Sequence, residues 1–177
     1  DIKRVSLGGP VFDTEKLDWL NGRYIRESLT DDEFIVRYTS WACDPGRIKQ
    51  IVPLVKPRVE RMSDVQPLAG FFLSALPAIT PDSFVHKSLT ADDMLRILQF
   101  VAWRVEEVRD WTRDALEQAL MKLSEQMTIK IRDLLFPLFI AIAGTAVSVS
   151  VIDSMAILGL DLSRARIRHA LNVLDRK

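Results

Sequence analysis

Apolar and polar positions alternate along most of this chain with a period of three to four residues, which is typical of amphipathic helices. The clearest apolar stripe consists of Met94, Leu98, Val101, Val105 and Val108. The same spacing, interrupted at prolines and glycines, predicts helices at about 13–27, 31–38, from 47 onward, 57–65, 91–108, 112–123, 129–143, 154–158 and 163–174, with a linking segment of short helical pieces over 66–88. Neither a strand–helix alternation nor an internal repeat accompanies these stripes, so the predicted fold class is all-α, a bundle of helices.

Capping residues mark where several of these helices begin. Four residues with cap-forming side chains stand just before a stripe: Asp13, Thr30, Thr90 and Thr112. Asp93 follows Thr90 by three positions, which is the spacing of a capping box. In the first helix, Leu17, Leu20 and Tyr24 form one apolar face. Gly22 costs that helix about 1 kcal/mol relative to alanine, which indicates either close packing against its backbone or a dispensable glycine on an exposed helix.

The composition is that of a folded protein. The chain has 177 residues, of which 48% are hydrophobic and 27% charged, enough for one domain or two small ones. Its single cysteine, Cys43, cannot form an internal disulfide, and the first residues lack the apolar run of a signal peptide. We therefore expect a cytoplasmic protein. The tryptophans are expected to be core or interface anchors: Trp19, Trp41, Trp103 and Trp111.

The net charge is zero, with 24 basic and 24 acidic residues, but the charges are segregated along the chain. Within 45–61 one glutamate stands among five basic residues: Arg47, Lys49, Lys56, Arg58 and Arg61. A second basic group lies near the end: Arg164, Arg166, Arg168, Arg176 and Lys177. This segregation suits a protein that touches a polyanion on one face. Composition by itself favours the plainer alternative of solvated helix surfaces.

Residues 134–152 contain no charged side chain and are just long enough to cross a bilayer. Pro137, Gly144 and several serines interrupt this segment, so we predict a buried helix, a turn at the glycine and an extended piece, without membrane association. The same segment supports an alternative function. A helical protein-interaction module could dock a partner through the apolar residues of 134–152.

Residue patterns that support catalysis are missing. The sequence has no Gly-rich phosphate loop after a strand, and its two histidines, His86 and His169, are far apart. Adjacent carboxylates such as Asp92 and Asp93 do not converge on one site when they lie on a helix. We therefore expect no catalytic residue, no metal site and no cofactor in this chain. A small helical enzyme is disfavoured for the same reason.

A proline-marked break accompanies the basic residues of the first half. Pro57 removes an amide donor, biases Lys56 away from helical geometry and can open a new helix, which places Arg58 in the first turn. There the planar guanidinium and free backbone amides could both meet RNA, because paired donors suit base acceptors and phosphates. A kinked surface helix with solvated charges is the alternative that the residues alone leave open.

Four segments together resemble bacterial glutamyl-tRNA synthetases. The first is Lys-Leu-Asp-Trp-Leu-Asn-Gly-Arg-Tyr-Ile-Arg at 16–26, preceded by Pro-Val-Phe-Asp, and the second is Val-Lys-Pro-Arg-Val-Glu-Arg-Met-Ser-Asp at 55–64. The third combines Trp111-Thr112 with Leu116, Glu117 and Leu120, and the fourth is Phe-Pro-Leu-Phe-Ile-Ala-Ile-Ala-Gly at 136–144, followed by Ser148 and Gly159. The segments follow in the family's order, so the resemblance covers nearly the whole chain.

The resemblance implies the C-terminal, anticodon-binding portion of such an enzyme. It places the end of a stem-contact region at 1–23 and two helical anticodon-binding subdomains at 24–82 and 83–177. The implied partner is tRNA (glutamate tRNA, glutamine tRNA or both), bound by a monomer. The family's two ATP-site signatures are absent from this sequence, so the chain alone should not activate an amino acid. ATP and Mg²⁺ would belong to the catalytic part of the parent enzyme.

The resemblance also implies six anticodon-binding residues: Lys56, Arg58, Arg61, Phe139, Gly144 and Ser148. An arginine in the family's version of the second motif reads the last anticodon base, which places that role on Arg58. It separates cytosine, whose pairing edge offers acceptors, from guanine, whose donors an arginine cannot satisfy. The sequence departs from the family where Phe139 replaces an arginine, Ala143 a threonine and Val149 a proline. Either Phe139 stacks on a base in place of the lost contact, or it belongs to the core.

Overall fold

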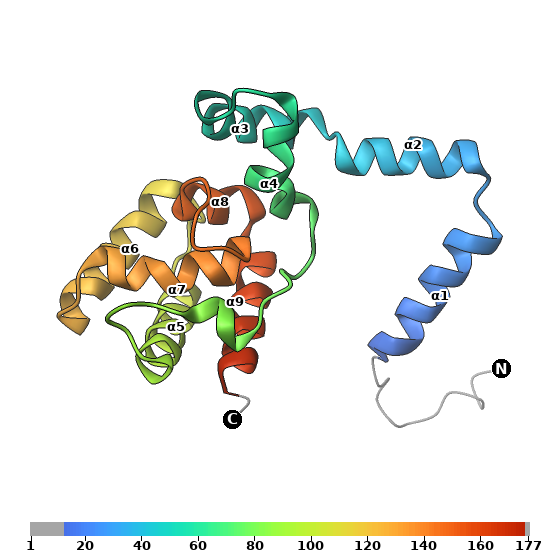
Figure 1. The fold of residues 1–177 in the computed structure, drawn as a ribbon. Coiled ribbons are helices and arrows are strands. Elements are labelled where there is room, and N and C mark those ends of the chain that lie inside the picture. Colours follow the sequence, from blue (N-terminus) through green and yellow to red (C-terminus); the bar gives the residue numbers. More distant parts are fainter. Residues whose placement is uncertain (1–12, 176–177) are drawn as a thin grey trace, which may run out of the picture. The chain divides into compact units, whose positions relative to one another are not determined.

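The computed structural model describes residues 13–175, and every regular element in that range is helical (Figure 1). The α-helices are α1 Thr14–Glu27, α2 Asp31–Ala42, α3 Pro45–Val55, α4 Val65–Ala69, α5 Ala91–Glu106, α6 Arg113–Met127, α7 Ile131–Ala143, α8 Val151–Leu158 and α9 Leu160–Leu174. Between α3 and α5 lie the short 3₁₀ helices η2 Lys56–Arg58, η3 Met62–Asp64, η4 Gly70–Leu73 and η5 Pro81–Phe84. The predicted all-α class is confirmed.

The predicted caps explain where four of the helices begin. Each of the four side chains accepts a hydrogen bond from the backbone N–H three positions later: Asp13, Thr30, Thr90 and Thr112. At the start of α5 the Asp93 carboxylate accepts from the backbone N–H of Thr90 at 2.9 Å and from its hydroxyl at 2.7 Å. Helix α2 continues to Ala42 rather than ending near Tyr38, because the first restricted position is Asp44, which precedes a proline.

The chain divides after Asp44 into two compact units, each described here by itself. In the first unit, over the described residues 13–44, helices α1 and α2 bury Ala42 alone. The apolar face of α1 exists as the spacing predicts, but it is about half exposed, at 50% for Leu17, 47% for Leu20 and 46% for Tyr24. The first unit therefore has helices without a core of its own.

Aromatic residues pack along α2 in the first unit, and a contact between Arg37 and Tyr24 joins α2 to α1. The ring of Tyr38 lies 6.2 Å from the ring of Phe34 and 6.2 Å from that of Trp41, measured between centroids. Arg37 donates a hydrogen bond of 3.2 Å to the Tyr24 hydroxyl, and its guanidinium lies over the Tyr24 ring. The contact between Arg37 and Tyr24 ties α1 to α2, whereas the ring contacts lie within α2 and leave large aromatic surfaces in solvent.

The structure decides between the alternatives left open for Gly22 and for the tryptophans. A Cβ added at Gly22 would first meet the Arg26 guanidinium, at 3.0 Å, so the movable end of a side chain is its nearest neighbour in the described part of the chain. Close backbone packing therefore does not explain this glycine. Trp19, Trp41 and Trp103 are exposed, which excludes the core and leaves the interface role as a prediction, whereas Trp111 is half-buried.

Helices α5 to α9 form the main core of the second unit, residues 45–175 (Figure 1). The segment 134–152 contributes much of this core through buried residues: Leu134, Leu138, Ile140, Ala141, Ile142, Val151 and Ile152. Because these side chains pack inward, they are not available to a partner, and the structure gives no support to the docking alternative. No helix within 13–175 is long and apolar enough to cross a membrane.

A smaller cluster joins the start of the second unit to the segment before α8. Its buried members are Val55 at the end of α3, Ala69 in α4, Phe72 in η4 and Val149. The residues around 55–72 and around 149 are therefore packed together although they lie far apart in sequence. The predicted division into subdomains at 24–82 and 83–177 stays a prediction.

The predicted helix over 57–65 is wrong. The chain instead forms η2, an extended residue at Val59 with φ −114° and ψ 139°, and then η3. The reason is local: the Asp64 carboxylate accepts hydrogen bonds from the backbone N–H groups of Glu60, at 3.1 Å, and Arg61, at 2.9 Å. Side-chain capture of these amides competes with a continuous helix.

Candidate nucleic-acid interface

The proline-marked break forms the first half of the candidate site, which we call the 56–61 loop. Pro57 stands in the first turn of η2, where its missing N–H is not needed, and the chain turns extended directly after Arg58. Lys56, Arg58 and Arg61 are all exposed. The two hydrogen bonds to Asp64 fix the end of the loop, so the three cations project from a backbone of defined shape.

The second half is the 144–150 loop between α7 and α8. Gly144 ends α7 with φ +79°, a left-handed conformation that L-residues with a side chain rarely adopt. At the other end Ser150 caps α8: its hydroxyl accepts from the backbone N–H of Asp153 at 3.4 Å, and its carbonyl accepts from the Ser154 hydroxyl at 2.7 Å. Both ends of the 144–150 loop are therefore held by helix termini.

One hydrogen bond joins the two loops. The Arg58 Nη1 donates to the carbonyl oxygen of Ser148 at 3.0 Å, across 90 positions of sequence. Beneath it, Val55 and Val149 belong to the same buried cluster. The Ser148 hydroxyl is buried and has no hydrogen-bond partner within the described part of the chain. The structure thus brings five of the six predicted site residues into two adjoining loops: Lys56, Arg58, Arg61, Gly144 and Ser148.

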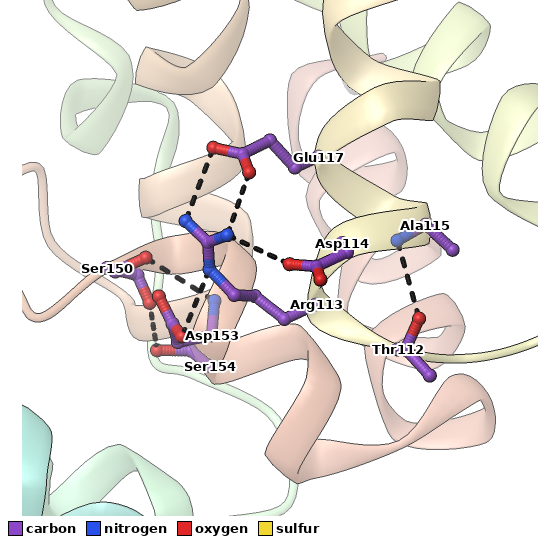
Figure 2. A network of polar contacts seen from close by, with 8 residues as sticks. All are labelled: Thr112, Arg113, Asp114, Ala115, Glu117, Ser150, Asp153 and Ser154. Atoms are coloured by element: carbon purple, nitrogen blue, oxygen red, sulfur yellow. Dashed lines mark hydrogen bonds and ion pairs between the residues drawn. The ribbon is translucent and has the colours of Figure 1, made fainter.

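A polar network anchors α8, and hence the 144–150 loop, to α6. Figure 2 shows the Arg113 guanidinium between carboxylates of its own helix and Asp153 of α8. It lies 2.8 Å from Glu117, 3.0 Å from Asp114 and 3.6 Å from Asp153. The hydrogen bond to Asp114, followed by the charge of Glu117, raises the pKa of Arg113. Half-exposed ion pairs of this kind contribute little energy, but here they orient one helix on another.

The third motif of the sequence makes the same connection. The Trp111 indole N–H donates to the carbonyl oxygen of Met155 in α8 at 2.8 Å. Thr112 caps α6, and Leu116 and Leu120 are fully buried in the main core. This motif therefore positions α8 through the indole contact and through the buried side chains of Leu116 and Leu120.

Phe139 lies in a different environment from the loop residues. It is partly buried and packs against the main core, on the helix that precedes Gly144. This position fits the second of the two alternatives for Phe139, a core residue. The departure from the family's arginine thus removes a cation from α7 and adds apolar contact area there.

The two basic groups of the sequence differ in their ion pairing in the structure. Arg164 and Arg168 both pair with Glu106 of α5, at 2.9 Å and 3.2 Å, while Arg176 and Lys177 lie outside the described residues. In contrast, within 13–175 the basic side chains of the 56–61 loop form no ion pair. The 56–61 loop is therefore the better candidate for contact with a polyanion.

Arg166 is the residue that sequence reasoning missed. It reads as one of five terminal cations, but it is fully buried, and desolvation lowers its pKa to about 10. Its neighbours on the same helix face gave a signal, because Ser163, Ile167 and Ala170 are spaced as a core stripe and are buried as well. A basic residue at a core position of a helix indicates an enclosed charge rather than a surface one.

The histidines have ordinary hydrogen-bonding roles. The His86 Nδ1 accepts from the backbone N–H of Ser88 at 3.2 Å, and the His169 Nε2 lies 3.1 Å from the carbonyl oxygen of Pro77. Over the described residues, no group of three or more potential ligands is arranged to hold a metal ion.

Comparison with known proteins gives consistent matches. The family model described as "Anticodon binding domain" matches residues 27–171. Three glutamate–tRNA ligases are similar over 98% of this chain, with 51% identity in Marinomonas sp. (strain MWYL1), 48% in Alcanivorax borkumensis and 46% in Marinobacter nauticus. The chain spans about a third of the length of these curated relatives, 35% in each case.

A solved structure gives the same fold. It is that of a glutamate tRNA ligase from Elizabethkingia meningosepticum CCUG26117 in complex with its amino acid, and it matches with a TM-score of 0.63. The match covers 99% of this chain and 35% of that one, with 18% identity. At this identity the likeness concerns the fold alone.

Proposed function

Since this chain belongs to the anticodon-binding domain family and corresponds to the C-terminal portion of glutamate–tRNA ligases, we propose that it binds the anticodon loop of a tRNA through the 56–61 and 144–150 loops. The observation that supports this most directly is the hydrogen bond from Arg58 to the carbonyl of Ser148. It uses one edge of the guanidinium to hold the side chain in place and leaves the other edge for a ligand.

The chemistry of the site suits unstacked RNA bases. A guanidinium held by one protein contact is oriented in advance, so its remaining donors can address a base edge or a phosphate in a fixed plane. Lys56 and Arg61 flank it with exposed cations that suit the phosphate backbone. Arg58 then reads the last anticodon base and favours cytosine, the base of glutamate tRNA, over guanine, the base of glutamine tRNA.

The 144–150 loop offers further contacts of two kinds. The buried hydroxyl of Ser148 has an unused hydrogen-bonding capacity, and an unmet buried polar group has a free-energy cost that a ligand can remove. At the tip of the loop, Val147 is 81% exposed, which gives a base an apolar surface to lie on. Phe139 packs against the core, so in this proposal it supports α7 rather than stacking on a base.

The catalytic reaction belongs, in this proposal, to the part of the ligase that this chain does not contain. The chain corresponds to 35% of its relatives' length, and the two ATP-site signatures are not in its sequence. Attachment of glutamate to tRNA, with ATP and Mg²⁺ as the required partners, would occur there. The present chain contributes recognition of the tRNA.

The test compares two arginine variants in tRNA binding. The ligand is a synthetic RNA hairpin with the anticodon loop of glutamate tRNA, titrated at low and high salt. Arg58→Ala should weaken binding by about tenfold or more, since a charge-assisted contact is lost. Arg132→Ala is the matched control: Arg132 is 79% exposed at the start of α7, about 20 Å along that helix from Gly144.

Binding by the unmodified chain should fall steeply as salt rises, because phosphate contacts release counterions. An affinity that is insensitive to salt would contradict the proposal. So would an Arg58→Ala variant that binds the hairpin as well as Arg132→Ala does.

A further inference from the structure

A buried arginine connects α9 to both sides of the proposed site. Through its three guanidinium nitrogens, Arg166 donates to four backbone carbonyls: Phe71, Ser74, Ala75 and Ile142. The first three belong to residues 71–77, which we call the connector, and Ile142 stands two positions before Gly144. One side chain thus joins the connector to the end of α7.

A second contact from α9 reaches the same place. The His169 Nε2 lies 3.1 Å from the carbonyl oxygen of Pro77, the last residue of the connector. Pro77 in turn packs against the first residue of the 144–150 loop, since a Cβ added at Gly144 would lie only 3.1 Å from the Pro77 Cβ. Arg166 and His169 therefore hold the two ends of the connector, and the connector touches the start of the loop.

The connector also supports the other side of the site. Phe72, which is 1% exposed, shares the small buried cluster with Val55, at the start of the 56–61 loop, and Val149. A displacement of the connector would consequently move the small buried cluster against which both loops pack. The distance between Arg58 and the Ser148 carbonyl depends on the position of that cluster.

The form of the Arg166 contacts indicates positioning rather than simple stabilisation. A buried cation without a carboxylate partner costs free energy, and well-packed apolar residues often replace buried charges without loss of stability. What an apolar residue cannot supply is a planar set of donors that fixes several carbonyls from two segments at once. The positive charge also lies at the C-terminal end of α7, where the helix dipole favours it.

We propose that Arg166 and His169 are positioning residues for tRNA recognition, which act by clamping the connector against the 144–150 loop so that Arg58 meets Ser148 in a fixed geometry. The role in tRNA recognition rests on the proposed function, and it is tested by an experiment with RNA. The clamp itself can be tested without RNA.

The experiment without RNA reports the conformation of the 144–150 loop directly. Val147 is replaced by a cysteine, Val147→Cys, in a Cys43→Ser background and labelled with a trifluoromethyl group for ¹⁹F spectroscopy. Val147 is 81% exposed, so the label fits without disturbing the core. The unmodified clamp should give a single sharp line, and Arg166→Lys, which keeps the charge but loses the planar donors, should broaden or split it. Arg168→Lys is the control on the exposed face of α9 and should leave the line unchanged.

The RNA arm uses a double-mutant cycle with Arg58→Ala. If Arg166 acts through the Arg58 site, Arg166→Lys should weaken hairpin binding about tenfold when Arg58 is present and less than about threefold when it is absent. An equal loss in both backgrounds, or a ¹⁹F line unaltered by Arg166→Lys, would overturn the clamp. If the unmodified chain does not bind the hairpin, the proposed function fails. The ¹⁹F experiment still tests whether Arg166 fixes the 144–150 loop.

Chemical denaturation first establishes that each variant is folded under the assay conditions. Should Arg166→Lys fail to fold, His169→Leu removes the contact with Pro77 and leaves the guanidinium contacts in place. The clamp then requires the ¹⁹F line to broaden and the hairpin affinity to fall only when Arg58 is present. A sharp line in folded His169→Leu would overturn it.

Discussion

The indole nitrogen of Trp111 lies 2.8 Å from the carbonyl oxygen of Met155, which ties the start of α6 to the middle of α8. The same carbonyl also accepts from the backbone N–H of Gly159 at 3.0 Å and from the Ser163 hydroxyl at 3.4 Å. It is therefore a meeting point for α6, α8 and α9, and it lies on the element that begins directly after the 144–150 loop.

Trp111→Phe should lower the free energy of unfolding by about 1 kcal/mol, because one hydrogen bond is lost while Met155 keeps its other donors. Urea denaturation measures this change. Trp103→Phe is a suitable control, since Trp103 is 66% exposed, and its effect should stay within about 0.5 kcal/mol. A cost for Trp103→Phe as large as that for Trp111→Phe would contradict the assigned role of the indole contact.

Arg58→Lys tests whether geometry or charge matters in the 56–61 loop. A lysine keeps the positive charge but lacks the planar set of donors that can hydrogen-bond the Ser148 carbonyl and a base edge at the same time. The salt dependence of hairpin binding should therefore remain, because it reports phosphate contacts. The ratio between the affinities for a hairpin whose anticodon ends in cytosine and one whose anticodon ends in guanine should fall by about tenfold. Binding titrations with the two hairpins give both quantities, and retained discrimination would show that the planar fork is unnecessary.

Gly144→Ala should lower the free energy of unfolding by about 1–2 kcal/mol from the positive φ alone, with a further loss from the close approach to Pro77. The second contribution can be isolated in a double-mutant cycle. In a Pro77→Gly background the Cβ at position 77 is gone, so Gly144→Ala should cost less there than in the unmodified chain. Denaturant titrations of the four proteins measure the difference, and equal costs would mean that the connector does not press on the loop.

The capping box at Thr90 predicts a pH dependence of stability. Hydrogen bonds from the Thr90 hydroxyl and then from its backbone N–H lower the pKa of Asp93 in the folded state. The contribution is therefore complete above the unfolded pKa of about 3.9 and disappears as the pH falls through the lower folded value. Asp93→Asn should flatten this part of the stability profile between about pH 5 and pH 2. Thermal melts across that range compare the two chains, and parallel curves would contradict the assignment.

Local signals predicted most of the secondary structure. Cap residues and apolar stripes act within one or two turns of a helix, so positions such as Thr90 and the stripe after it could be recognised from neighbouring residues. The broken helix after Val55 could not be recognised in this way. There Asp64 takes two backbone amides, and an ordinary helical pattern does not reveal that competition.

The candidate site was predictable only in part, for a related reason. Motifs pointed to Arg58 and Ser148 separately, but their contact spans 90 positions and depends on the buried cluster beneath both loops. Residue type alone does not report burial, so the sequence groups Arg166 with surface charges although its helical spacing matches a core face. The exposed apolar face of α1 is the opposite case, in which a core-like pattern does not meet a core within the first unit.

The enclosed Arg166 has a consequence for the order of folding events. Its four acceptors come from segments near residue 73 and residue 142, so the guanidinium can leave water only after both segments have docked on α9. We therefore expect dehydration of that cation late in assembly, after the rate-limiting barrier. Substitutions there should accelerate unfolding and leave the refolding rate almost unaltered.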